Sequence, residues 1–430
     1  MPEPKFPHVF PDGFLLPAPA QKTDLTADAG ISLGLSAAEI VRRARAEKRL
    51  AVIVCADAGD MIKLADELTW FDPTLRVSVL PDWETLPYDT MSPHEDLVSE
   101  RLETLWKLVV NAQAREKGAE SKAHCDVILT SAATASQRLA PPSFILGSSF
   151  FYKKGQQLDV GVLRTNLVQA GYGSVEQVMA PGEFCVRGGI VDVFPMGSQA
   201  PFRLDLFDDE IETIRTFDTE TQRSGDDIDE IRILPGHEFP MDEAARNAFR
   251  SAWRETFPGG PNKSVVYKDM GQGIAAGIEY YLPLFFKETA TLADYLPADT
   301  LIVLSGDVNQ ALTRFHTEIT DRWRFLSHDE ERPALAPERI ADAPDAFFTH
   351  LARFARLALK TQPAAAALSV TVNRNAADPF AGLKTYLTKA RLQKRRVLIC
   401  TTSTGRTARI EEMLAQNDFK MACAGNFTAF

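Results

Sequence analysis

The stretch "LAVIVCADAGDMIKLADELTWFDPTLRVSVL", from Leu50 to Leu80, decides the fold class. It opens with the apolar run Leu50–Cys55, which has the length and composition of a buried strand. Asp57 follows at once, with an amphipathic helical pattern over 57–71, and a second apolar strand at 75–80 closes the unit. This strand, helix, strand order predicts a parallel sheet.

The same rhythm extends outward from this unit. The segment 36–48, "SAAEIVRRARAEK", predicts a helix before it, and Cys125–Ser131 and Thr300–Gly306 predict two more strands. These two strands are separated by about 170 residues of different character, which indicates an insertion. Within it, Phe202–Asp218 alternates apolar and polar residues around Asp208-Asp209, the pattern of a β-hairpin. A small β-rich domain inserted into an α/β domain is therefore expected.

The C-terminal part predicts another α/β unit. Residues 334–347 have the composition of a linker or of a loop that joins helices. Beyond residue 365 we expect a helix at 380–394, a strand at 395–402 and a helix at 405–417. The unit then stops before it is complete, so we expect the chain to be a fragment of something longer.

The loop "LPDWETLPYDTMSP" leads from the second strand into a long helix. Trp83, Leu86 and Tyr88 are expected to bury apolar area beneath it, and its three prolines lower the entropy cost of holding it. Ser92 and Pro93 have the order of an N-cap and a first helical residue, so a helix should begin there. We assign this loop no catalytic role.

Composition bounds the function classes. With 430 residues, 45% of them hydrophobic and 24% charged, the chain is long enough for two to four soluble globular domains. A net charge of −11 disfavours a surface that grips nucleic acid throughout. No apolar run is long enough to span a bilayer and the N-terminus lacks a signal pattern, so the expected compartment is the cytoplasm.

Catalytic, metal and cofactor sites find no support. The cysteines are odd in number and form no CxxC, so neither disulfides nor zinc are expected, and the histidines form no HExxH. We expect the cysteines to be small buried residues. The cysteines are Cys55, Cys125, Cys185, Cys400 and Cys423, and the histidines are His8, His94, His124, His237, His316, His328 and His350.

A nucleotide site is also disfavoured. A P-loop requires the order GxxxxGK[ST], and the chain contains no Gly-Lys dipeptide. Where such a loop is expected, Gly34 is followed by Glu39, which would place negative charge beside phosphate. The acidic run Phe207–Glu212 fits a solvated hairpin turn better than a magnesium site.

Several long stretches together resemble the N-terminal region of the Mfd family, the bacterial transcription-repair coupling factors. They are "LPDWETLPYDTMSPHEDLVSERLETL", "GYGSVEQVMAPGEFCVRGGIVDVFPMGSQAPFRLDLFDDEIETIRTFDTETQRS", "LPGHEFP" and "AGIEYYLPLFF". They cover most of residues 70–305 in the family's order. That region is in turn similar to UvrB, a RecA-like α/β domain interrupted by a UvrA-binding domain.

The resemblance implies an α/β fold class: a degenerate RecA-like parallel-sheet domain, a small inserted α+β UvrA-binding domain, and the start of a further α/β domain. Compared with UvrB, "GLSAAEI" replaces the P-loop, and Ser305-Gly306-Asp307 replaces the DExH motif. The chain as it stands is thus expected not to be an enzyme. The implied ranges are 1–149 and 236–365 for the RecA-like domain, 150–235 for the insertion and 366–430 for the further domain.

The family's partners follow from the same resemblance. It implies UvrA as the partner of this chain, which is expected to be a monomer with no bound cofactor and no membrane contact. ATP, magnesium, RNA polymerase and double-stranded DNA are expected only for motor and polymerase-binding domains that lie outside these residues.

The inserted domain carries the candidate interface. Period two places Phe202, Leu204 and Leu206 on one face of a strand and Arg203 and Phe207 on the other. Arginine and aromatic residues on an open face are typical of interface hot spots. Arg187, Arg203 and Phe207 match the UvrA-contacting positions of the UvrB-like pattern.

Three alternatives stay open. The arginines could pair with Asp192, Asp205 or Asp209 while Phe207 closes a satellite core. The chain could be a UvrB-like module that binds damaged DNA directly, for which Ala390–Arg396 is the best basic patch. An active nucleotide hydrolase with an unusual site is the third alternative.

Overall fold

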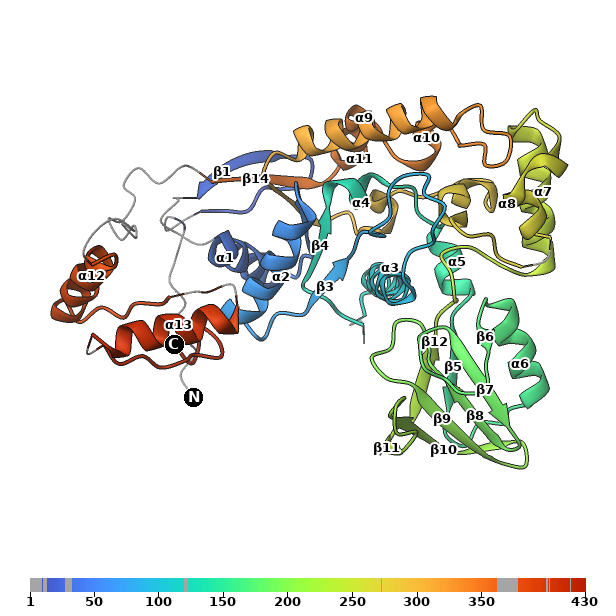
Figure 1. Ribbon diagram of the computed structural model, residues 1–430, viewed down its shortest axis with the longest axis horizontal. Coiled ribbons are helices and arrows are strands. Elements are labelled where there is room, and N and C mark those ends of the chain that lie inside the picture. Colours follow the sequence, from blue (N-terminus) through green and yellow to red (C-terminus); the bar gives the residue numbers. More distant parts are fainter. Residues whose placement is uncertain are drawn as a thin grey trace.

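The computed structural model describes residues 10, 14–27, 33–119, 123–271, 273–361, 378–399, 401, 403–417 and 419–430. Figure 1 shows an α/β body, a β-rich domain that projects from it, and two helices near the C-terminus on its other side. In the described part of the chain, no helix is long and apolar enough to cross a bilayer.

The α/β body is built on the expected parallel sheet. All neighbouring strands run parallel, in the order β1-β14-β13-β2-β4-β3. The sequence did not predict β1 and β14, because neither contains the continuous apolar run that is typical of a central strand. The strands are β1 Lys22–Ala27, β2 Ala51–Cys55, β3 Val77–Leu80, β4 Val127–Ser131, β13 Leu301–Ser305 and β14 Ala355–Thr361.

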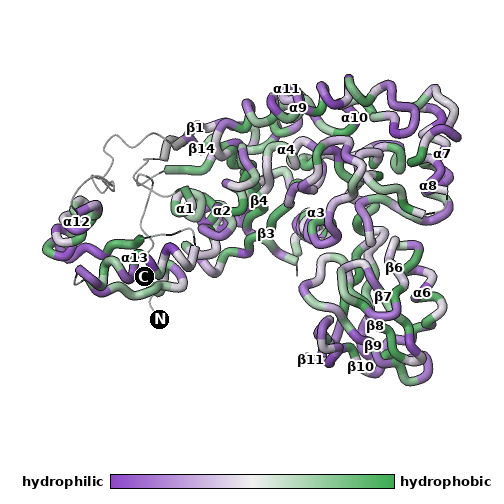
Figure 2. The backbone as a smooth tube through the Cα atoms, viewed as in Figure 1, coloured by the Kyte–Doolittle hydropathy of each residue, from purple (hydrophilic) through white to green (hydrophobic). Residues whose placement is uncertain are grey.

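Helices cover both faces of this sheet. Ile53 in β2 packs under α1 and α2, whereas Val52 and Val54 pack toward α3, because successive side chains of a strand point to opposite faces. Figure 2 shows β3 and β4 of this sheet as mostly hydrophobic along their length, as expected for strands with both faces covered. The helices are α1 Leu33–Ala46, α2 Ala58–Phe71, α3 Glu95–Glu116, α4 Ala132–Ser136, α9 Val308–Leu326 and α11 Pro344–Leu351.

The inserted domain follows α5 (Pro142–Gly147) and has a six-stranded sheet in the order β11-β10-β9-β8-β7-β6, with α6 (Val160–Gln169) beside it. The expected hairpin is confirmed: β9 and β10 pair antiparallel, and Asp208 turns between them at a φ of 52°. The strands are β6 Gly173–Ser174, β7 Glu183–Arg187, β8 Ile190–Val193, β9 Phe202–Phe207, β10 Glu210–Phe217 and β11 Ser224–Asp227, with a separate ribbon of β5 Phe150–Lys153 and β12 Glu230–Ile233.

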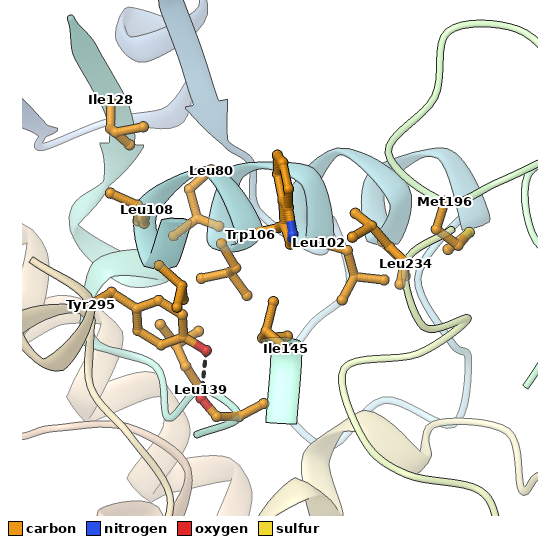
Figure 3. Packing of buried hydrophobic residues seen from close by; sticks show 14 of the residues in the cluster. Leu80, Leu102, Trp106, Leu108, Ile128, Leu139, Ile145, Met196, Leu234 and Tyr295 are labelled. Atoms are coloured by element: carbon orange, nitrogen blue, oxygen red, sulfur yellow. Dashed lines mark hydrogen bonds between the residues drawn. The ribbon is translucent and has the colours of Figure 1, made fainter. Parts of the chain in front are cut away.

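The inserted domain is packed against α3 rather than tethered loosely to it. Figure 3 shows Leu234 beside Leu102 of α3, and both belong to one continuous core. The guanidinium of Arg232 lies 3.9 Å above the ring of Trp106 on α3. The amide of Gly197 donates a 2.8 Å hydrogen bond to the hydroxyl of Ser99 on the same helix.

The loop after β3 is held by a buried ion pair. Arg101 donates to both carboxylate oxygens of Glu238, at 2.5 and 3.2 Å, and to the carbonyl of Pro81 at 2.8 Å. Trp83 donates its indole N–H to the same carboxylate, and the Arg101 guanidinium lies over its ring. Trp83 is buried and Tyr88 half-buried, as expected, but Leu86 is half exposed. Two residues later, Tyr88 adopts a φ of 62° and donates its hydroxyl to the Leu335 carbonyl at 2.7 Å.

The start of α3 differs from the prediction. The helix begins at Glu95 with His94 as its N-cap, and the His94 ring accepts a hydrogen bond from the Asp96 amide. Ser92 does not cap the helix, because its hydroxyl donates to Glu279 and accepts from the Gly277 amide. A long-range contact has thus replaced the local one.

Between the inserted domain and β13, the chain forms an aromatic subdomain. Its core gathers Trp253, Phe249, Tyr281 and Phe285, which are buried against one another. Its elements are α7 Glu243–Thr256, η1 Pro261–Lys263, α8 Val265–Asp269, η2 Ile278–Leu284 and η3 Leu292–Tyr295, and α10 Pro337–Ile340 packs on it from the segment that was predicted as a loop.

The C-terminal part contains the two expected helices, α12 (Ala381–Leu392) and α13 (Thr404–Ala415). The strand expected at 395–402 is wrong for the described positions 395–399 and 401, where no described strand lies alongside to share backbone hydrogen bonds. Cys55, Cys125 and Cys185 are buried as expected, Cys423 is exposed, and Cys400 lies outside the described residues.

Candidate partner interface

The sheet of the inserted domain has one face in the core and one face open. Phe184, Val191, Leu204 and Ile214 come from four adjacent strands and are fully buried toward α6. Pairing places Leu204 opposite both Val191 and Ile214, so this face is a continuous apolar layer. Figure 2 shows the mixed hydrophobic and hydrophilic strands that such a half-buried sheet requires.

The open face presents charged residues in cross-strand rows. One row runs Cys185, Asp192, Arg203, Arg215 and Asp227 across five strands. The next row contains Arg187, Ile190, Asp205 and Thr213. All three predicted site residues therefore lie on one face of one sheet, within three adjacent strands.

Asp192 is the centre of this face. It is only 1% exposed, yet its carboxylate accepts hydrogen bonds from two arginines. Arg203 donates to both oxygens at 2.7 and 2.9 Å, and Arg187 donates to one of them at 2.6 Å. Of the carboxylates considered as partners from the sequence, Asp192 is the one that both guanidinium groups use.

The two arginines differ in how much of each is available. The Arg203 side chain is 16% exposed, lies 4.9 Å over the ring of Phe217, and also donates to the Gln222 carbonyl. Its hydrogen bonds to Asp192 raise the pKa of Arg203 above its ordinary value. The Arg187 side chain is 52% exposed, and Asp192 is its one hydrogen-bonding partner among the described residues.

Phe207 lies at the tip of the β9–β10 hairpin and is 70% exposed. The satellite cluster on this face instead consists of Val178, Cys185 and Phe217. Ile190, 37% exposed, lies on the same face opposite Asp205, two residues before Phe207 along β9. Ile190 was not among the predicted site residues, although the alternation of "IVDV", with Val191 and Val193 buried inward, indicates that it lies on the open face.

Glycine keeps the neighbouring turn close to β9. A Cβ at Gly189 would lie 3.0 Å from the carbonyl oxygen of Leu206, which is tighter than ordinary contact. The Leu206 amide also donates to the Gly189 carbonyl at 2.8 Å. The turn between β7 and β8 therefore packs directly against the backbone of Leu206, the residue before the exposed Phe207.

The position where a nucleotide would be expected holds a carboxylate. Gly34 lies inside the first turn of α1, and its amide donates to the side chain of Glu67 at 2.8 Å. Glu39 is buried and pairs with Arg43. Asp307, in the place of the second motif, is the N-cap of α9. Among the described residues, no group of three His, Cys, Asp or Glu side chains is arranged to hold a metal ion.

The family model described as "UvrB interaction domain" matches residues 151–239, the inserted domain with its open face. The transcription-repair-coupling factor of Escherichia coli K12 is 41% identical over 313 residues, which are 72% of this chain and 26% of that protein. The chain corresponds to the N-terminal region of the transcription-repair-coupling factors.

Transcription-repair-coupling factors of other bacteria are also similar to this chain. The transcription-repair-coupling factor of Haemophilus influenzae is 36% identical over 410 residues, 92% of this chain and 34% of that protein. That of Bacillus subtilis is 28% identical over 258 residues, 56% of this chain and 21% of that protein. The chain thus spans about a quarter to a third of the length of the first two of these relatives.

Proposed function

We propose that this chain is the UvrA-recruiting module of a transcription-repair-coupling factor. The observation that carries the proposal is the open face of the inserted domain, where exposed Phe207 and half-exposed Arg187 lie on a sheet whose other face is buried in the core. The match of residues 151–239 to the UvrB interaction domain supports UvrA as the partner. The chain would offer UvrA the surface that UvrB also offers.

The chemistry of the face fits recognition rather than catalysis. Phe207 supplies apolar anchoring, and Arg187 supplies charge-assisted hydrogen bonds to an acidic group of the partner. Arg203 contributes mainly through Asp192 and Phe217, because its donors are already used within the domain. In this proposal no residue of the chain is catalytic and no cofactor is required.

The whole protein would act in the cytoplasm at lesions where RNA polymerase has stalled. An ATP- and magnesium-dependent motor on double-stranded DNA would belong to domains beyond these residues. We propose that this chain does not hydrolyse ATP; the Glu67 carboxylate at the start of α1 and the absence of Gly-Lys support this part of the proposal.

The test is the affinity of purified UvrA for this chain as a monomer in solution, measured by isothermal titration. Phe207→Ala is expected to weaken binding by about 2 kcal/mol, or about 30-fold, if Phe207 is a hot spot. Val168→Ala is the matched control, because Val168 is an exposed apolar residue of α6, on the covered side of the same sheet. Equal affinity of both variants and the parent would contradict the proposal, as would salt-sensitive binding to DNA without binding to UvrA.

A further inference from the structure

At one buried carboxylate of the open face, two positive charges meet a single negative charge. Two guanidinium groups share the single carboxylate of Asp192, which is 1% exposed. Burial of a carboxylate is unfavourable unless its charge is paired and its oxygens accept hydrogen bonds. Here Arg203 satisfies both oxygens by itself, so the contact with Arg187 is additional to what burial of Asp192 requires.

We propose that Asp192 is a positioning residue of the interface, which fixes Arg187 so that its unused N–H donors face a carboxylate of the partner. This inference rests on the function proposed above. A guanidinium has five N–H donors. One of those of Arg187 is taken by Asp192, and the described residues provide no other partner, so the remaining donors point to solvent from a fixed base.

Fixing Arg187 matters because a free arginine loses much side-chain freedom on binding. The two hydrogen bonds from Arg203 hold the Asp192 carboxylate in one orientation, and Asp192 in turn holds Arg187. A partner then finds the guanidinium already oriented. Arg203 thereby supports binding without having to touch the partner.

The surroundings of Arg187 define the chemistry of the group it receives. Ile190 lies directly across from Arg187 in the strand pair, and Phe207 projects from the next strand. Asp205, on the same face, is occupied by the Thr213 hydroxyl at 2.9 Å. The matching surface is a carboxylate beside an apolar pocket, in which Ile190 and Phe207 would displace water and strengthen the ion pair.

A double-mutant cycle with UvrA tests the assignment. Asp192→Asn is expected to weaken binding about tenfold in the parent chain but less than twofold in an Arg187→Ala background, because Asp192 acts through Arg187. Asp227→Asn is the control, since it removes the same charge from an exposed pair with Arg215 in the same sheet. An equal loss in both backgrounds, or no loss in either, would overturn the proposal.

A second measurement does not depend on the partner. Nuclear magnetic resonance of ¹⁵N-labelled arginine side chains in the full chain should show slow rotation of the Arg187 guanidinium in the parent and at least severalfold faster rotation in Asp192→Asn. Unchanged rotation overturns the positioning role, whether or not UvrA binds. Failure of UvrA to bind the parent chain would by itself reject only the recruitment function. Should Asp192→Asn not fold, Asp192→Ser, which is uncharged and smaller than the buried aspartate, replaces it in both measurements with the same expected pattern.

Discussion

The buried pair of Arg101 and Glu238 gives a sharp stability prediction. Both side chains are at most 3% exposed, and three of the hydrogen bonds in this network end on Glu238. Glu238→Ala leaves the Arg101 guanidinium buried, with the Pro81 carbonyl as its remaining hydrogen-bond acceptor among the described residues. Removal of one partner from a buried pair costs about 3–5 kcal/mol, because the other charge stays buried and uncompensated.

Urea denaturation, followed by circular dichroism and by hydrogen exchange of the amides at 82–90, measures this cost. The control Glu330→Ala removes an exposed pair with Lys263 and is expected to cost less than about 1 kcal/mol. The double variant Arg101→Met, Glu238→Leu removes both charges and should recover most of the loss. If Glu238→Ala is as stable as the parent, or if the double variant is no better than the single one, the reasoning about this network is wrong.

Two further predictions concern buried positions near the same loop. Burial raises the pKa of Glu279 from 4.5 to about 7, so the protonated form stabilises the fold; this contribution is full below pH 4.5 and is lost as the pH rises through 7. The free energy of unfolding of Glu279→Gln, taken relative to that of the parent, should therefore be higher at pH 8 than at pH 5, by up to about 3 kcal/mol. A difference in denaturation midpoints between variant and parent that does not change with pH would contradict this assignment. Gly277 has a φ of 71°, and a Cβ there would lie 2.4 Å from the Asp89 carbonyl oxygen, so Gly277→Ala should destabilise the chain by at least about 1 kcal/mol. Gly259→Ala, where a Cβ meets nothing within 4 Å, is its control in the same thermal unfolding experiment, and equal melting temperatures for the two variants would refute the steric argument.

The sequence predicts the elements whose pattern is strong and local. The apolar run at β2, the alternation along β9 and β10 and the turn at Asp208 are each sufficient to define their element. It does not predict β1, whose composition is ordinary and whose strand exists because β14, more than 300 residues later, pairs with it. The prediction that Ser92 caps α3 was wrong for a related reason, since the Ser92 hydroxyl forms hydrogen bonds with Glu279 and Gly277, which are distant in sequence.

The sequence was sufficient to predict which residues share the open face, but not which carboxylate pairs with the arginines. Period two places Arg203 and Phe207 on one side of the strand, and the family resemblance adds Arg187. The sequence leaves three carboxylates as possible partners, because pairing across strands depends on register. The register places Asp192 directly opposite Arg203, which explains why one arginine is fully engaged and the other is half exposed.

The most direct test of the account is a photo-crosslink from position 207 to UvrA. A photoreactive phenylalanine analogue at Phe207 should form an adduct with UvrA, and the same analogue at Val168 should not, since α6 lies on the covered side of the sheet. Adducts from 207 alone would place UvrA on the open face. Adducts from 168 alone, or none from 207 in a chain that binds UvrA, would contradict the central claim.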